Sequence, residues 1–427
     1  MADGNGRRSL WPVLDAGHWR LLSLLGWASF FEGYDFNIVT VALKPLRTSF
    51  HAGQATASLW IAVIYLGALP AVVLARRADR HGRRVLLLWS IAGYSVFTAL
   101  TAAAPDFPVF VALQWTARLF LVLESALVWT VVAEELPASA RGFGFGWLAM
   151  LSALGTGWSA ILWGSVLHPL GASWRWLYLA ALPVLFVVAR LWGSLSETGR
   201  FTGVGAEAAR RDQWRRLLRA PHRRRLVVLC LIAVTANLTT QATVFVVDFM
   251  QTQRHLSASA ASLTLVASGA LAIPVLVGAG ALSDRVGRKP VVCTSLVGGV
   301  LGVYCFFDLA HGRLALFGAL ALVYVGLFAA WPTGTGFGSE LFPTALRASG
   351  NAIGAGAKYV GQALSFVVAG VLITGSASLG RVVMLLAIGP VVAAALIAVV
   401  LPETGGRELE EISPTPVETA LVVPELP

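Results

Sequence analysis

Charged residues are scarce in this sequence of 427 residues, since Asp, Glu, Lys and Arg together make up only 13% of it. Intrinsic disorder is excluded, because disordered chains combine high charge with few apolar residues, and 57% of these residues are hydrophobic. A disulfide framework is excluded too, because the three cysteines, Cys230, Cys293 and Cys305, all lie in apolar runs without a pairing pattern. A mean hydropathy of +0.73 exceeds that of ordinary soluble proteins. The composition therefore predicts a membrane protein.

Sequence motifs of catalysis are also missing. The sequence has no Walker A glycine loop, no metal-ligand cluster and no spacing typical of a nucleophile triad. An ATPase or another enzyme is therefore not expected, and neither is a cofactor or a metal.

Apolar runs of about 20 residues, the length that crosses a hydrocarbon core of roughly 30 Å, recur along the whole chain. A β-barrel is excluded, because its strands would alternate in short segments. The first run is too long for a signal-peptide core and contains Glu32 and Asp35, so it is predicted to be a retained helix. The runs predict twelve transmembrane helices, at approximately 21–44, 57–78, 85–104, 107–135, 141–168, 174–196, 226–251, 259–282, 290–309, 313–340, 347–374 and 378–401.

The net charge of +10 follows the predicted topology, because Lys and Arg in short loops stay on the cytoplasmic side of a membrane. With the N-terminus inside, most basic loop residues fall on that side, in the loops around residues 76–84, 141, 200–225, 285–289 and 347. The opposite loops hold only Lys44, Arg47, Arg175, Arg254, Arg313 and Arg381. Both termini are therefore predicted to be cytoplasmic in the plasma (inner) membrane, and the charge requires no nucleic-acid partner.

A long hydrophilic stretch divides the predicted helices into six and six. It carries a basic amphipathic piece, Trp214–Arg219, which is expected to lie on anionic lipid. The predicted organisation is a leader at 1–20, a six-helix bundle at 21–196, a basic linker at 197–225, a second six-helix bundle at 226–401 and a tail at 402–427.

Three motifs of the first half recur in the second half. The segment 79–84 (Asp-Arg-His-Gly-Arg-Arg) returns 205 residues later as 284–289 (Asp-Arg-Val-Gly-Arg-Lys). Glu134, Pro137 and Arg141 return 206 residues later as Glu340, Pro343 and Arg347, and Glu197-Thr198-Gly199 returns as Glu403-Thr404-Gly405. A repeat of this kind predicts two parallel halves related by an axis along the membrane normal, with a central cavity.

These repeated motifs, together with Pro402-Glu403-Thr404 and Leu409-Glu410-Glu411, resemble the major facilitator superfamily. The resemblance implies an all-α membrane protein with twelve transmembrane helices in two pseudo-symmetric six-helix bundles, acting as a secondary transporter by alternating access. Glu32-Gly33-Tyr34-Asp35 is similar to the Asp-Gly-x-Asp of aromatic-acid and related metabolite:proton symporters. The Pro-Glu-Thr ending is shared with sugar porters.

The repeated loops are predicted to form a gate latch, because an aspartate that ends a helix can pair with basic groups in only one of two conformations. A simple topogenic cluster would explain the arginines but not the repeated Asp and Gly. The predicted gating residues are Asp79, Arg80, Gly82, Arg83, Glu134, Arg141, Asp284, Arg285, Gly287, Arg288, Glu340 and Arg347.

Charges deep in the apolar runs are the candidates for chemistry, because they persist there only when paired or beside water. Glu32 and Asp35 share a helix face about 17–21 Å deep, and Arg118 on the fourth helix lies about 17 Å deep. Glu32, Asp35 and Glu124 are predicted to carry protons. The alternatives are a static ion pair of the first two with Arg118, and a structural partnership of Glu124 with another helix.

Substrate binding is predicted for Arg118 and Lys358, two cations at similar depth in opposite halves that could close on one anion. Asn237, Gln241 and Trp331 are predicted to be polar and aromatic lining. The alternatives are that Lys358 neutralises a buried acid and that the amides stabilise helix packing.

The function favoured by these residues is proton-coupled symport, the import of a small organic acid such as an aromatic carboxylate. Its partners are expected to be the anionic small molecule, protons and the lipid bilayer, and the transporter is expected to work as a monomer. A sugar:proton symporter is an alternative favoured by the Pro-Glu-Thr ending. A drug:proton antiporter is a further alternative. It is disfavoured, because the fifth helix of such antiporters normally carries a Gly-Pro motif and no proline occurs between Arg141 and Leu167 in this sequence. A membrane sensor with a transporter fold is the alternative outside transport.

Overall fold

The computed structural model describes residues 14–81, 83–136, 141–194, 222–340, 344–375 and 377–403, and every regular element among them is a helix. The chain forms two compact units. The first comprises Met1–Ala42 and Pro70–Thr202, and the second comprises Leu43–Leu69 and Gly203–Pro427. Helix α1 (Ala16–Ser49) continues from the first unit into the second without a break.

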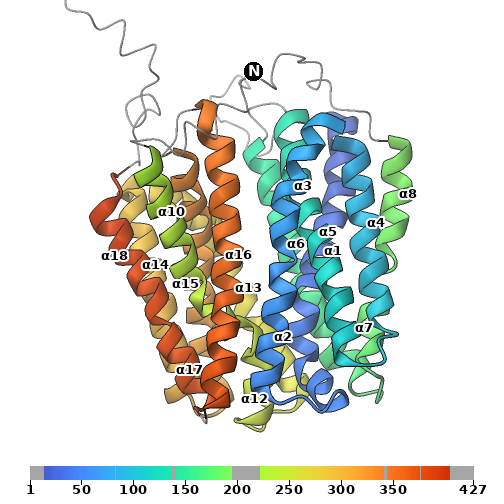
Figure 1. Ribbon diagram of the computed structural model, residues 1–427, viewed down its shortest axis with the longest axis vertical. Coiled ribbons are helices and arrows are strands. Elements are labelled where there is room, and N and C mark those ends of the chain that lie inside the picture. Colours follow the sequence, from blue (N-terminus) through green and yellow to red (C-terminus); the bar gives the residue numbers. More distant parts are fainter. Residues whose placement is uncertain are drawn as a thin grey trace, which may run out of the picture. The chain divides into compact units, whose positions relative to one another are not determined.

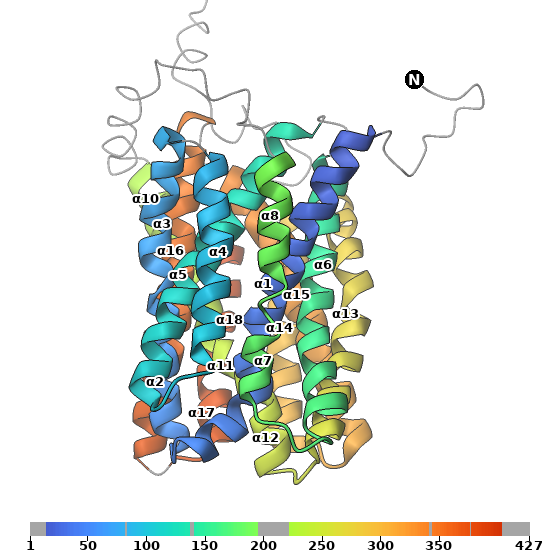
Figure 2. The ribbon, with the colours of Figure 1, turned by 90° about the vertical axis from the view of Figure 1, so that its right-hand side faces the viewer.

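Seven further helices belong wholly or mainly to the first unit. They are α3 (Ala68–His81), α4 (Arg83–Thr101), α5 (Phe107–Glu135), α6 (Arg141–Ile161), the π-helical η1 (Leu162–Leu167), α7 (Arg175–Leu179) and α8 (Val184–Ser194). Helix α4 packs against α5, α7 and α8, and Figure 2 shows α4 beside α8.

The second unit has the remaining helices. They are α2 (Gln54–Leu66), α10 (His222–Ala236), η3 (Asn237–Thr239), α11 (Thr240–Val244), α12 (Val246–Thr252), α13 (Ala258–Val286), α14 (Arg288–Tyr304), η4 (Cys305–Leu309), α15 (Arg313–Glu340), α16 (Thr344–Thr374), α17 (Leu379–Leu386) and α18 (Ile388–Val400). Helix α14 packs against both α15 and α18, which lie beside it in Figure 1.

The predicted fold class is confirmed. Each of the twelve predicted spans coincides with one helix or with consecutive short helices. Within the described ranges, nine helical segments are long and apolar enough to cross a membrane. Residues 1–13 of the predicted leader (1–20), residues 197–221 of the predicted linker (197–225) and the tail from residue 404 lie outside the described residues. The described ends of the leader and the linker are helical, since α1 begins at Ala16 and α10 begins at His222.

The first predicted span is longer than its hydropathy indicates. The apolar run ends near residue 44, but α1 continues through Pro45 to Ser49. Lys44 and Arg47, predicted to lie in a loop, are therefore in the last turns of this helix. The end is stabilised by polar contacts, since the Lys44 ammonium donates to the backbone oxygen of Gln251 at 3.3 Å.

A buried ion pair fixes this end of α1 within the second unit. The Arg47 guanidinium lies 2.7 Å from both carboxylate oxygens of Asp248 on α12, and Gln54 Nε2 donates to the same carboxylate at 3.0 Å. The Asp248 side chain is fully buried, whereas that of Arg47 keeps 18% exposure. Three hydrogen bonds from two donor groups, Arg47 and Gln54, thus compensate the desolvation of one carboxylate, which is the condition for burying it.

Glycines set the closest helix contacts in the first unit. A Cβ placed at Gly33 of α1 would collide with the backbone of Ser152 on α6, and one at Gly155 would collide with the backbone of Phe30. Small residues allow helices in a bilayer to approach this closely, because van der Waals packing is a main source of their attraction. The pairing of α1 with α6 therefore depends on these two positions.

The span at 226–251 is broken into α10, η3, α11 and α12. Side-chain hydroxyls satisfy backbone oxygens around the break, since Thr240 donates to Asn237 at 2.7 Å and Thr243 donates to Thr240 at 2.8 Å. Such hydrogen bonds compensate for interrupted helical bonding inside a membrane. The break places Asn237 on η3 and Gln241 on the short helix α11.

Candidate functional site

Helix α1 is held in the first unit by polar side chains on successive faces. The Tyr34 hydroxyl donates to the backbone oxygen of Leu177 at 2.7 Å. Asn37 Nδ2 donates to the backbone oxygen of Thr156 at 3.0 Å and to the hydroxyl of Ser159 at 2.9 Å. These bonds fix the rotation of α1 and therefore the direction of the acidic residues between and before them.

Asp35 is buried among α1, α4 and α5. Its Oδ1 accepts a hydrogen bond from the Thr98 hydroxyl of α4 at 2.8 Å, and the guanidinium of Arg118 on α5 attracts it electrostatically. Arg118 keeps only 4% exposure, and its guanidinium carbon lies 4.7 Å from the centre of the Phe36 ring. The structure thus brings together two of the residues that sequence reasoning had placed at one depth.

Two further acids lie near this group. Glu124 of α5 is fully buried, and neither of its carboxylate oxygens has a hydrogen-bond partner among the residues that the structure describes. The half-buried Glu32 of α1 interacts with it electrostatically. Burial without a hydrogen-bond donor favours the neutral, protonated form of a carboxyl group.

The second unit gathers three primary amides at the helix break. Gln362 Nε2 of α16 donates to Asn237 Oδ1 across a long contact of 3.5 Å, and Asn237 Nδ2 donates to the backbone oxygen of Ala233 at 2.8 Å. Gln241 has no exposed surface, and neither atom of its amide has a partner in the part of the chain described here. This cluster therefore retains hydrogen-bonding capacity beyond what its own packing uses.

The predicted cationic substrate residues lie in different units, and the predicted aromatic one has no described side chain. Lys358 of α16 is half-buried, and its ammonium lies 5.7 Å from the centre of the Tyr359 ring. It belongs to the second unit, whereas Arg118 belongs to the first. The side chain of Trp331 lies outside what the structure describes.

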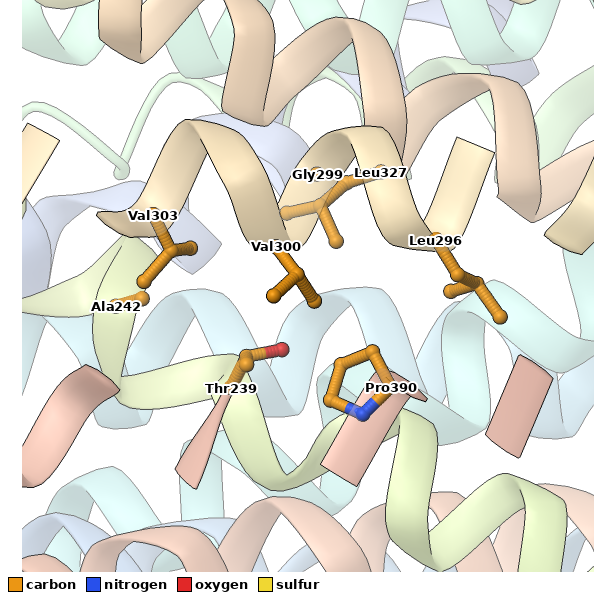
Figure 3. Close-up of a pocket in the computed structure, with 8 residues that line it drawn as sticks. All are labelled: Thr239, Ala242, Leu296, Gly299, Val300, Val303, Leu327 and Pro390. Carbon is orange, nitrogen blue, oxygen red and sulfur yellow. The ribbon is translucent and has the colours of Figure 1, made fainter. Parts of the chain in front are cut away.

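A small cavity in the second unit adjoins the helix break. Its volume is about 10 Å³, room for about one water molecule. Val300, Thr239 and Pro390 converge on it in Figure 3, and the Thr239 side chain is its polar group. A cavity this small and apolar does not hold a substrate.

Most predicted gating residues lie where the structure does not describe side chains. Gly82 and Pro137 lie outside the described residues altogether. The side chains not described are those of Asp79, Arg80, Arg83, Glu134, Arg141, Asp284, Arg285, Glu340 and Arg347. Gly287 and Arg288 are described: Gly287 has φ +106°, and the backbone N–H of Arg288 donates to Glu403 Oε1 at 2.8 Å. Their gating role stays a prediction.

Sequence reasoning missed four polar residues around these acids and amides. Three of them are uncharged, and the sequence criterion was a charged residue deep in an apolar run. These three are Thr98, Tyr94 and Gln362. Asp248 is charged, but it lies only three residues before the end of the predicted span 226–251, so it was not singled out as a charge deep in an apolar run. In the described ranges no group of three His, Cys, Asp or Glu residues could hold a metal ion.

Comparison with known proteins places these observations in a family. Residues 25–278 match the model of the Major Facilitator Superfamily, and residues 202–415 match that of the Sugar (and other) transporter family. The ectoine/proline transporter ProP of Corynebacterium glutamicum is 30% identical over 370 residues, which cover 76% of this chain and 72% of the relative. Human solute carrier family 22 member 12 is 28% identical over 88% of this chain and 73% of the relative.

Solved structures show the same fold. The inward-open xylose transporter XylE from E. coli superposes with a TM-score of 0.76, covering 92% of this chain and 99% of that structure. The sequence identity is 17%, so this likeness establishes the fold alone.

Proposed function

Because this chain belongs to the major facilitator superfamily, whose members are membrane transporters of small molecules and not enzymes, we propose that it is a proton-coupled symporter that imports a small organic acid. The proton gradient is the energy source. Both termini are cytoplasmic in this proposal, in accord with the distribution of Lys and Arg over the loops.

One observation carries the proton coupling. A buried aspartate, Asp35, accepts a hydrogen bond from Thr98 and lies in the electrostatic field of the buried Arg118. A carboxylate in this position gains or loses its proton according to whether the arginine or water faces it, so its proton affinity follows the conformational cycle. Asp35 is therefore the proposed coupling residue, with Glu32 and Glu124 as further proton sites.

The substrate class rests on the two cations and on the relatives. Arg118 and Lys358 each place a positive charge deep in an apolar segment, where an anionic ligand offsets its cost. The relative ProP is described as an ectoine/proline transporter, and both ectoine and proline carry a carboxyl group. A carboxylate is thus the proposed recognition element, with Asn237, Gln241 and Trp331 as further binding residues.

The coupling is tested with Asp35→Asn in proteoliposomes. A thermal-shift screen of aromatic carboxylates, short carboxylates and sugars first identifies a ligand, since a compound that binds only the folded state raises the apparent stability. Asp35→Asn is expected to abolish uphill accumulation driven by a pH gradient while it spares exchange of labelled substrate. Asp308→Asn, which neutralises an exposed aspartate, is the matched control and keeps full accumulation. Undiminished accumulation by Asp35→Asn rejects the assignment.

The anionic substrate is tested with Lys358→Gln and Lys358→Arg. Binding of a carboxylate is compared with that of its neutral amide at fixed pH. Lys358→Gln is expected to weaken only carboxylate binding, by about 1.5–3 kcal/mol for a charged hydrogen bond, and Lys358→Arg is expected to retain part of it. Equal binding of both ligands by the parent protein removes the anion from consideration.

A neutral, hydroxyl-rich substrate such as a sugar is the second candidate. It is favoured by Gln241, which is fully buried with both amide atoms unpartnered among the described residues, and by Gln362, whose amide donates to Asn237. Primary amides donate to and accept from hydroxyl groups at the same time. A thermal shift by sugars and none by carboxylates moves this candidate to first place, and Gln241→Leu then abolishes that shift.

A further inference from the structure

The packing of α4 against α5 defines two levels of side chains in the first unit. Gln114 Nε2 donates to Thr101 Oγ1 at 3.1 Å, and the rings of Phe97 and Phe120 stack with 5.9 Å between their centres. These contacts show that α4 and α5 run antiparallel. Going from the first contact to the second, the residue number falls on α4 (Thr101 to Phe97) and rises on α5 (Gln114 to Phe120). The same register places Thr98 level with Arg118.

One turn before Thr98, the register brings Tyr94 of α4 within about one turn of Glu124 of α5. Helices α1 and α4 begin at the same end of the unit (Figure 2), and Thr98 meets Asp35. Glu32 therefore lies one turn before Asp35, at the level of Tyr94. One level thus holds Asp35, Thr98 and Arg118, and a second level, about one turn nearer the starts of α1 and α4, holds Glu32, Tyr94 and Glu124.

Tyr94 interacts with acidic residues of both levels. It has no exposed surface, and its hydroxyl has no hydrogen-bond partner in the described part of the chain. Its position four residues before Thr98 puts both side chains on one face of α4. Electrostatic interactions link Tyr94 to Glu124, Asp35 and Glu32, in decreasing order of strength.

Other described ionisable groups lie on α7 and α8, which also pack against α4. Arg175 of α7 donates to the backbone oxygen of Ala104, beyond the far end of α4, at 3.0 Å. Arg190 of α8 lies 4.8 Å from the ring centre of the exposed Phe186. Tyr178 of α7 is linked electrostatically to Asp35, Tyr34 and Arg118.

We propose that the Tyr94 hydroxyl relays protons between the carboxyl pair of α1, Glu32 and Asp35, and the buried Glu124 of α5. This inference rests on the proposed proton coupling and adds a residue and a route to it. A fully buried Glu124 exchanges its proton only through a neighbouring donor and acceptor, and a phenol is both.

The relay step conserves protons and charge. The Tyr94 hydroxyl and the Glu124 carboxyl group have no hydrogen-bond partner among the described residues, so in this proposal a side-chain rotation first brings the hydroxyl into contact with both carboxyl groups. The phenol oxygen of Tyr94 then accepts the proton of an α1 carboxylic acid while its own O–H proton passes to the Glu124 carboxylate. One O–H bond breaks and one forms at Tyr94, which is neutral before and after the step. The α1 group becomes a carboxylate and Glu124 becomes a carboxylic acid, and the reverse step returns the proton.

The test follows the Glu124 proton directly and needs no substrate. The purified protein is moved from H₂O to D₂O, and infrared spectroscopy follows the carboxylic acid C=O band that Glu124→Gln removes. Tyr94→Phe is expected to slow deuteration of this band by about 100-fold, the scale of one lost acid–base group. Tyr178→Phe is the matched control, because Tyr178 is also fully buried with an unpartnered hydroxyl among the described residues. It is expected to leave the rate unchanged.

Three outcomes overturn the relay. They are an unchanged rate in Tyr94→Phe, equal slowing in Tyr94→Phe and Tyr178→Phe, and the lack of any carboxylic acid band sensitive to Glu124→Gln. A relay confirmed by the band, in a protein that accumulates nothing under a pH gradient, instead refutes the proposed transport function and leaves the proton route in place.

Discussion

The carboxylate of Glu403 caps helix α14 at Arg288, although 115 residues separate the two in the sequence. Its second oxygen accepts the next backbone N–H, that of Lys289, at 3.1 Å. A Cβ at Gly287 would lie 2.9 Å from this carboxylate, and the φ of +106° at Gly287 is one that side chains disfavour. The Pro-Glu-Thr motif and the second repeated loop, recognised separately in the sequence, are therefore one structural element.

Glu403→Gln is expected to lower the free energy of unfolding by about 1–2 kcal/mol, because it removes a charge from two backbone donors at a helix N-terminus. Thermal unfolding followed by tryptophan fluorescence measures the effect. Glu135→Gln, at an exposed glutamate, is the control. Equal melting temperatures for the two variants would contradict a stabilising cap.

Gly155→Ala is expected to destabilise the first unit by about 1–3 kcal/mol, because the added methyl group forces α1 and α6 apart. Gly157→Ala is the matched control on the same helix, since a Cβ there meets nothing within 4 Å. It is expected to be neutral or slightly stabilising, because alanine favours the helix. A tolerated alanine at residue 155, judged by yield and melting temperature, would show that the helices can separate without cost.

Arg47 and Asp248 are expected to depend on each other. Asp248→Asn leaves the partly buried Arg47 guanidinium without its counter-charge and is expected to cost about 1–3 kcal/mol. The exchange Arg47→Asp with Asp248→Arg restores part of this loss, which a double-mutant cycle of melting temperatures measures. Additive effects of the two single exchanges would mean that the ion pair contributes nothing.

Asp79→Asn tests the predicted latch. The substitution is expected to reduce transport turnover more than ligand affinity, because a latch residue acts on the conformational equilibrium and not on the ligand. Initial uptake rates and ligand binding are measured on the same preparation. Weaker binding together with an unchanged cycling rate would assign Asp79 to the substrate site instead.

The fold could be predicted because a bilayer requires long apolar helices. Apolar runs in the sequence give the number of these helices, and the repeated motifs show that the two halves are related. The breaks could not be predicted. Hydropathy averaged over a span does not distinguish one continuous helix from α10, η3, α11 and α12 in succession. The extension of α1 to Ser49 was missed for a related reason: its last turns are polar and are held by a partner, Asp248, that lies 201 residues away from Arg47.

The site could be predicted only as far as charge reveals it. Asp35 and Arg118 were identified because each is costly in an apolar segment, and depth along a helix then placed them together. Tyr94 and Thr98 carry no charge and resemble ordinary helix residues, so only the rotation of α4 identifies them. That rotation is set by packing against α5, including the stacked pair Phe97 and Phe120, which sequence spacing does not contain.

The bonds from Asn37 to Thr156 and Ser159 also constrain how the chain is made. They join residues 119 and 122 positions apart, so α6 does not yet exist when α1 leaves the ribosome. At roughly 5–20 residues per second, α1 waits about 6–24 s for its partner. During that interval the Asn37 amide lacks both of its α6 acceptors. An amide without a partner is costly in hydrocarbon, so α1 reaches its full stability in the bilayer only after α6 has been made.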